Sequence, residues 1–162
     1  MSIIVEDGTG KTDSETYITI VEYQSYLTNY GYAADTGTDA EIEAAMRRGM
    51  IKIESFAYKG EHTNSDQALS YPRVNVSYRG KYIDSDEIPT GLKNATAEAT
   101  RLERATSGIL SQSVTKNIKK KKIDVLETEY FSPSGSTTKY TQIENFLKGL
   151  IYSSSLVEFE RG

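Results

Sequence analysis

The sequence predicts a mainly α-helical protein, a small bundle of about four helices with a protruding β-ribbon and extended N- and C-terminal arms. Three observations predict this fold. Capping boxes at Thr19 and Thr38 each precede apolar residues at helical spacing. Pro89 precedes a third stretch with that spacing. Residues 113–131 alternate imperfectly between apolar and charged side chains, as in a two-stranded ribbon with one solvated face.

The first helix is predicted to begin after Thr19, which pairs with Glu22 in a capping box. Four apolar side chains then recur on one helix face: Tyr23, Tyr26, Leu27 and Tyr30. Gly31 is predicted to end the helix, because glycine readily adopts the left-handed conformation that follows many helices.

The second helix is the longest predicted element. It begins after Thr38, which forms a capping box with Glu41, and its apolar spacing continues for about four turns to Ala57. Gly49 lies in its middle, where glycine costs roughly 1 kcal/mol relative to alanine. We therefore expect a neighbouring helix to approach closely at this glycine.

Two further helices complete the bundle. The third is predicted to have Pro89 at its first helical position and to run to about Ile109, with an alanine-rich face that requires a close neighbour. The fourth spans about residues 141–151, with Thr141 and Glu144 as its predicted capping box.

These elements divide the chain into four parts. They are an N-terminal arm (1–18), a helical bundle core (19–112) with a long irregular loop (58–88), a lysine-rich β-ribbon (113–131), and a C-terminal helix and tail (132–162). A loop of this length in a small domain is usually functional or ordered by a partner.

The composition of the chain argues against several kinds of binding site and against a membrane protein. The 162 residues carry a formal net charge of −4 and include no cysteine and a single histidine, His62, which is predicted to lie on the surface. We therefore expect no disulfide, no metal site and no cofactor. No apolar run is long enough to span a membrane, and no secretory signal is visible, so no membrane partner is expected and synthesis is expected in a cytosol.

Residues 8–12, Gly-Thr-Gly-Lys-Thr, look like the end of a phosphate-binding loop. The first glycine of that motif would be residue 5, which is Val5, a β-branched residue that resists the required backbone geometry. The carboxylates of Asp13 and Glu15 follow, where they would repel a phosphate. The sequence therefore predicts a polar turn in which Glu6, Asp13 and Glu15 are solvated, and no enzymatic activity is expected.

The order of several short motifs along this chain resembles the order found in a family of tailed-phage proteins. These are the head–tail connector or adaptor (head-completion) proteins, often labelled DnaT-like single-stranded DNA-binding proteins. The matching motifs are Val-Glu-Asp-Gly-Thr-Gly at residues 5–10 with Ser14 and Tyr17-Ile18, Tyr-Lys-Gly at 58–60, Gln-Ala-Leu-Ser-Tyr-Pro-Arg at 67–73 and Ile-Pro at 88–89. The likeness covers about residues 3–110. The chain departs from the family at Tyr58 and Tyr71, where tryptophan is common.

The resemblance implies a structural virion protein of the phage neck, assembled in the host cytoplasm. About twelve copies would form a ring beneath the portal protein, extend the DNA channel and dock the next neck or tail component. Double-stranded DNA would pass through the ring without sequence-specific contacts. The alternative is a single-stranded DNA-binding replication protein of the DnaT-like kind.

Three groups of residues are candidate contact sites. The lysine cluster could contact DNA in the channel, dock onto an acidic portal surface, or form a solvated ribbon edge, and it comprises Lys116, Lys119, Lys120, Lys121 and Lys122. An apolar docking tail is formed by Leu156, Val157 and Phe159. Candidate inter-subunit contacts are Arg47, Arg48 and Arg73. For Arg47 and Arg48, an ordinary solvated pair is the alternative, and for Arg73 the alternative is a local contact within the chain. Tyr71-Pro72-Arg73 is also predicted to anchor the long loop beneath the bundle.

Overall fold

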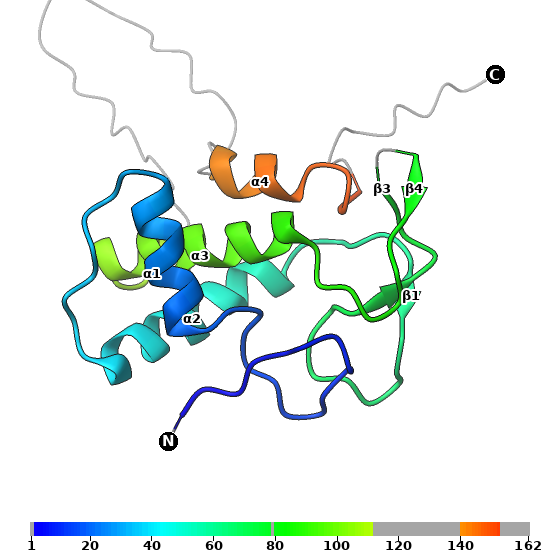
Figure 1. Ribbon diagram of the computed structural model, residues 1–162, viewed down its shortest axis with the longest axis horizontal. Coiled ribbons are helices and arrows are strands. Elements are labelled where there is room, and N and C mark those ends of the chain that lie inside the picture. The colour runs from blue at the N-terminus through cyan, green and yellow to red at the C-terminus, as the bar shows by residue number, and fades with distance from the viewer. Residues whose placement is uncertain (1, 79, 112–139, 153–162) are drawn as a thin grey trace, which may run out of the picture.

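The computed structural model describes residues 2–78, 80–111 and 140–152 (Figure 1). Its helices are α1 (Ile20–Asn29), α2 (Asp39–Glu54), α3 (Thr90–Ala105) and α4 (Thr141–Leu147), with a short 3-10 turn η1 (Ile109–Ser111) after α3. The prediction of a mainly α-helical bundle with four helices is confirmed. The predicted lysine-rich ribbon, the lysine cluster and the apolar tail lie outside the described residues.

Both N-terminal capping boxes are confirmed. The backbone N–H of Glu22 donates to the Thr19 hydroxyl at 3.1 Å, and the backbone N–H of Thr19 donates to the Glu22 carboxylate at 2.7 Å. Thr38 and Glu41 make the same reciprocal pair at the start of α2. These bonds satisfy amide groups that have no partner inside the helix, so each helix begins where its sequence signal predicts.

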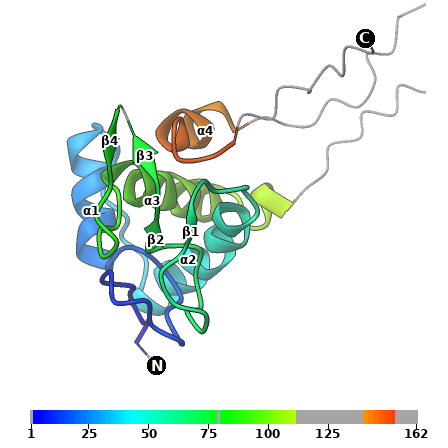
Figure 2. The ribbon, with the colours of Figure 1, turned by 90° about the vertical axis from the view of Figure 1, so that its right-hand side faces the viewer.

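The helix α3 lies at the centre of the bundle. It contacts α1, α2 and α4, which surround it on three sides (Figures 1 and 2). A Cβ atom built on Gly49 of α2 would lie 3.2 Å from the backbone carbonyl carbon and Cβ of Ala99 and from the backbone nitrogen of Thr100. The predicted close approach at Gly49 is therefore confirmed, and α3 is the neighbour.

Several helix boundaries differ from the prediction. The helix α3 ends at Ala105 rather than near Ile109, and α4 ends at Leu147 rather than near residue 151. Pro89 is the N-cap of α3, with a ψ of 138° that places it outside the helix. The predicted cap of α4 by Thr141 is wrong, because Thr141 is already helical and the N-cap residue, Tyr140, makes no side-chain cap bond. The helix α2 ends at Glu54 rather than at Ala57: the N–H groups of Ser55 and Phe56 bond to carbonyls three residues back, and Tyr58 then pairs with Ile151 in an antiparallel bridge.

The long loop contains two small antiparallel hairpins, at the right of Figure 1. One pairs β1 (Glu61–His62) with β2 (Arg73–Val74), and the other pairs β3 (Ser77–Tyr78) with β4 (Lys81–Tyr82). Sequence reasoning missed both, because each strand has only two residues, too few for an alternation of apolar and polar side chains to be visible.

The apolar side chains form two clusters. One lies between α2, α3 and α4 and includes the aromatic rings of Tyr17, Tyr58 and Tyr71 from the N-terminal segment and the long loop. The second joins α1 to α2 and includes Ile3. Tyr71 is fully buried and its N–H donates to the Tyr17 hydroxyl, so its predicted role as an anchor of the long loop is confirmed. No helix among the described residues is long and apolar enough to cross a membrane.

Candidate functional site

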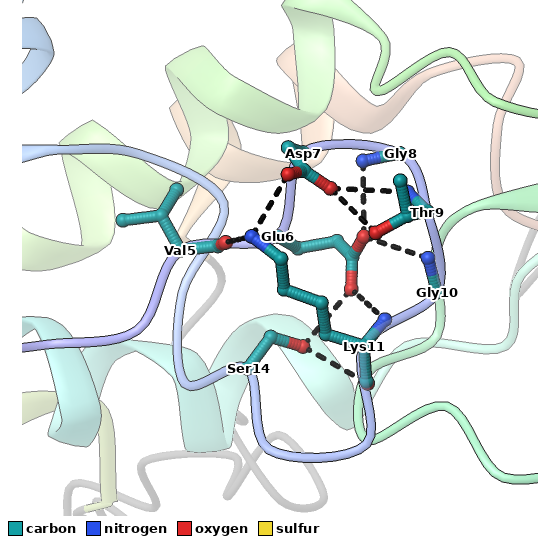
Figure 3. A network of polar contacts seen from close by, with 8 residues as sticks. All are labelled: Val5, Glu6, Asp7, Gly8, Thr9, Gly10, Lys11 and Ser14. Atoms are coloured by element: carbon teal, nitrogen blue, oxygen red, sulfur yellow. Dashed lines mark hydrogen bonds and ion pairs between the residues drawn. The ribbon is translucent and has the colours of Figure 1, made fainter.

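The carboxylate of Glu6 is enclosed by the loop that follows it, and Figure 3 shows the contacts. The backbone N–H groups of Gly8 and Gly10 donate to its Oε1 at 2.9 Å each, and that of Lys11 donates to Oε2 at 2.8 Å. The Ser14 hydroxyl donates to Oε2 at 3.1 Å. We call these four donors the Glu6 nest, since successive N–H groups directed at one anion form an anion-binding concavity.

The two glycines allow the backbone to adopt the conformation that the Glu6 nest requires. Gly8 and Gly10 have φ values of 101° and 72°, in the left-handed region that favours glycine. A Cβ atom on Gly8 would lie 1.8 Å from the backbone oxygen of Asp86, so the loop also packs directly against the segment before α3. The nest therefore fixes the N-terminal segment to the bundle and to the end of the long loop.

The prediction that Glu6 is solvated is wrong, since the residue is only 2% exposed. Sequence reasoning treated the acidic residues of this segment alike. The missed signal was the pair of glycines at two and four residues after Glu6, which can turn their amides toward its carboxylate. Asp13 is exposed, as predicted, whereas Glu15 is half-buried in an ion pair.

The likeness of residues 8–12 to a phosphate-binding loop has a physical explanation. The amides that would face a phosphate are directed at an anion, but that anion is the chain's own Glu6 carboxylate. The Lys11 ammonium donates to the Val5 carbonyl at 2.8 Å and lies 2.9 Å from the Asp7 carboxylate. Loop amides and lysine are thus both engaged by groups of the same loop.

The three arginines predicted to contact other subunits all have partners within their own chain. Arg47 donates to both carboxylate oxygens of Glu15, at 2.6 and 3.0 Å. Arg48 donates to the fully buried Glu103 carboxylate at 3.0 Å. Arg73 donates to three backbone carbonyls of the long loop. These contacts assign each arginine a role in holding the monomer together, and the inter-subunit role stays a prediction.

Charge is unevenly distributed between the described and the other residues. The described residues include eleven lysines and arginines against eighteen aspartates and glutamates. Each of their five arginines binds a carboxylate or a backbone carbonyl within the described part of the chain. The described part of the chain is therefore acidic, and each of its guanidinium groups has at least one partner there.

The two ends of the segment that contains the lysine cluster lie together. The Tyr140 hydroxyl, just before α4, donates to the carbonyl of Ile109 in η1. The Glu103 carboxylate accepts the N–H groups of Gly108 at 2.7 Å and Leu110 at 3.0 Å, which fixes the turn after α3. The described residues on either side of residues 112–139 thus lie together in the bundle, at a place that we call the segment base.

Asp35 and Arg104 form an ion pair that sequence reasoning did not find. Two guanidinium nitrogens of Arg104 lie 2.7 and 2.9 Å from the Asp35 oxygens, and the N–H of Gly37 adds a third bond at 2.9 Å. The hydrogen bonds from Arg104 hold the pKa of Asp35 below its ordinary value of 3.8. The pair connects the segment before α2 to the end of α3.

Asp35→Asn is expected to lower the free energy of unfolding at pH 7 by about 1.5–3 kcal/mol, the usual worth of a hydrogen bond to a charged group. Because folding lowers the Asp35 pKa, this contribution is present above pH 4 and is lost as the pH falls through the folded-state value. Urea unfolding at pH 7, 5 and 3 should show the variant approaching the wild type at low pH. Asp84→Asn, at an exposed aspartate, is the control. A difference that does not change with pH would contradict the assignment.

Comparison with known proteins identifies a family. A family model described as "Putative DnaT-like ssDNA binding protein" matches residues 1–162. No curated protein and no solved structure matches the chain. The description agrees more closely with the alternative hypothesis, a single-stranded DNA-binding protein, than with a neck adaptor. Since the match covers the whole chain, this protein belongs to the family of DnaT-like single-stranded DNA-binding proteins that bears this description.

Proposed function

We propose that this protein is a structural adaptor of the phage neck, which forms a ring of about twelve copies beneath the portal. The observation that carries the proposal is the acidic described part of the chain, with eighteen aspartates and glutamates against eleven lysines and arginines. A nucleic-acid-binding domain needs a basic surface to neutralise phosphates. An acidic body instead favours contacts with protein and repels DNA that passes through a ring.

In this proposal the ring extends the DNA channel and docks the next neck or tail protein. In this ring the lysine cluster, Lys116 and Lys119 to Lys122, contacts the portal or the passing DNA. The apolar tail residues Leu156, Val157 and Phe159 dock onto another chain. The adaptor works through assembly, in the virion neck, without catalysis and without a cofactor.

The second candidate is a single-stranded DNA-binding replication protein, and the family description favours it. Because the described body is acidic, phosphate contacts would have to come from the lysine cluster. Tyr130 and Phe131 are the nearest aromatic residues on which bases could stack. The two candidates therefore differ in what the lysine cluster binds: the portal or passing duplex DNA for an adaptor, and single-stranded DNA for a replication protein.

Sedimentation with the cognate portal ring distinguishes the two candidates. An adaptor is expected to form stable complexes with the portal and to bind single-stranded DNA only weakly at about 150 mM salt. A replication protein is expected to bind single strands with submicromolar affinity and a salt dependence whose logarithmic slope is about −3 for four phosphate contacts. Tight strand binding without portal association would refute the adaptor proposal.

Two variants with equal loss of charge test whether the lysine cluster is responsible for portal or strand binding. In one, Lys119 to Lys122 are replaced by alanine. The control replaces four described lysines that make no ion pair with a described residue: Lys52, Lys59, Lys81 and Lys148. Both variants lose the same charge, so only a specific role of the cluster makes them differ in portal or strand binding.

A further inference from the structure

A cavity of about 320 Å³ lies between α1, the segment after it and the last turns of α3. Tyr23, Leu27 and Tyr32 give it an apolar wall, and Arg101 and Arg104 give it two guanidinium groups. None of these residues belongs to the Glu6 nest, the lysine cluster or the segment base. We call this cavity the arginine pocket.

The two arginines of the pocket are held in place. Arg101 binds both oxygens of Glu98 through Nε and Nη2, at 2.8 and 2.6 Å, and its guanidinium carbon lies 4.4 Å from the centre of the Tyr32 ring. Arg104 binds Asp35 through the same two nitrogens. Among the described residues, neither Nη1 has a hydrogen-bond partner. Each guanidinium thus keeps a donor edge for a further carboxylate, in a fixed orientation.

The chain contains a segment of complementary chemistry. Residues 156–160 read Leu-Val-Glu-Phe-Glu, an aromatic side chain flanked by two carboxylates and preceded by two aliphatic residues. The Phe159 ring suits an apolar wall of tyrosine and leucine, while Glu158 and Glu160 suit the two donor edges. An aromatic anchor in a pocket with charged residues at its rim is typical of a peptide-binding site.

Geometry favours the tail of a second copy over the chain's own tail. Tyr152 pairs with Ala57, beyond the C-terminal end of α2, whereas Asp35 in the pocket precedes the N-terminal end of α2. The 16 residues of α2 alone span about 24 Å. The seven residues from Tyr152 to Phe159 reach at most about 25 Å when fully extended. Its own tail would therefore need almost its full extension to reach the pocket, whereas the tail of a second copy has no such constraint.

We infer that the arginine pocket binds residues 156–160 of a second copy of this chain, with Phe159 against Tyr32 and with Glu158 and Glu160 on Arg101 and Arg104. The inference rests on the proposed ring, in which each subunit contributes one tail and one pocket to neighbours of the same kind. Such a head-to-tail contact closes into a ring when the rotation between neighbours allows it.

Photo-crosslinking tests this inference in the full-length protein. Phe159→benzoylphenylalanine chains are mixed with isotope-labelled wild-type chains and irradiated, with and without the portal ring. We expect cross-links between an unlabelled tail and labelled peptides that contain residues 23–35 or 101–105. Tyr152→benzoylphenylalanine, at an exposed position of the body, is the control and is expected to give no cross-link to these peptides.

Two neighbouring alanines test whether the pocket itself is needed. Ala33 and Ala34 are both exposed, but only Ala33 lines the pocket. Ala33→Trp is expected to lower the cross-link yield at least fivefold by filling the pocket, whereas Ala34→Trp is expected to leave it within twofold. Equal yields in both variants would overturn the inference.

The outcomes separate this inference from the proposed function. Portal-bound rings whose tails cross-link elsewhere would overturn the pocket assignment and leave the adaptor proposal standing. If the protein does not bind the portal, the adaptor proposal fails. Cross-linking of the concentrated protein alone then tests the pocket assignment. Intermolecular cross-links to the pocket would support the assignment in that case, and their absence would overturn it.

Discussion

Glu6→Ala is expected to lower the free energy of unfolding by about 3–4 kcal/mol, because it leaves several donors of a buried loop without an acceptor. The three N–H groups of Gly8, Gly10 and Lys11 and the Ser14 hydroxyl all point at the carboxylate that this change removes. Hydrogen bonds to a charged group are each worth about 1.5–3 kcal/mol, and water entering the vacated space offsets part of their sum. Urea unfolding at pH 7 measures the loss.

Small anions provide a diagnostic control for this prediction. If the nest is a true anion site, formate at tens of millimolar should raise the stability of the Glu6→Ala variant and leave that of the wild type unchanged. Asp13→Ala removes an exposed carboxylate of the same segment and is expected to change the free energy of unfolding by less than about 0.5 kcal/mol. Equal losses at both positions would contradict the role assigned to Glu6.

Gly49→Leu is expected to lower the free energy of unfolding by about 3 kcal/mol, at the upper end of what overpacking costs. A bare Cβ atom at this position already lies 3.2 Å from three atoms of Ala99 and Thr100, two of which belong to the backbone. A leucine side chain would force α2 and α3 apart. Since α3 also contacts α1 and α4, the separation would disturb the packing of the whole bundle. Thermal and urea unfolding measure the effect.

Two variants separate overpacking from helix propensity. Gly49→Ala gains about 1 kcal/mol of helix propensity and loses a comparable amount to the tight contact, so it is expected to change stability by less than about 1 kcal/mol. Ala40→Leu adds a leucine to an exposed position of the same helix and is expected to have little effect. A Gly49→Leu variant as stable as wild type would show that the two helices can separate without cost.

The sequence predicted those parts of the fold that depend on local interactions. The capping boxes at Thr19 and Thr38 need only residues three positions apart, and both form as predicted. The close approach at Gly49 was predictable because glycine is costly inside a helix. The end of α2 at Glu54 was not predictable, because the residues that follow it pair with Tyr152, nearly one hundred residues away.

The distinction between local and long-range interactions also explains which contacts of the candidate site could be predicted. Glu6 was predicted to be solvated because nothing in its residue type says that the next turn will wrap around it. Asp35 and Arg104 are 69 positions apart, and Arg48 and Glu103 are 55 apart, so their pairing depends on how α2 and the segment before it pack on α3. The order of the motifs pointed to proteins labelled DnaT-like, and the match over residues 1–162 confirms that label, whereas the adaptor role stays a prediction.

The segment base has a consequence for how this protein can change over evolutionary time. The hydrogen bond from the Tyr140 hydroxyl to the Ile109 carbonyl holds together the chain positions on either side of residues 112–139. The entropy of closing a loop grows slowly, by only about 0.6 kcal/mol for each doubling of its length. Changes in the length of the connection between residues 111 and 140 are therefore expected to cost little in loop-closure entropy.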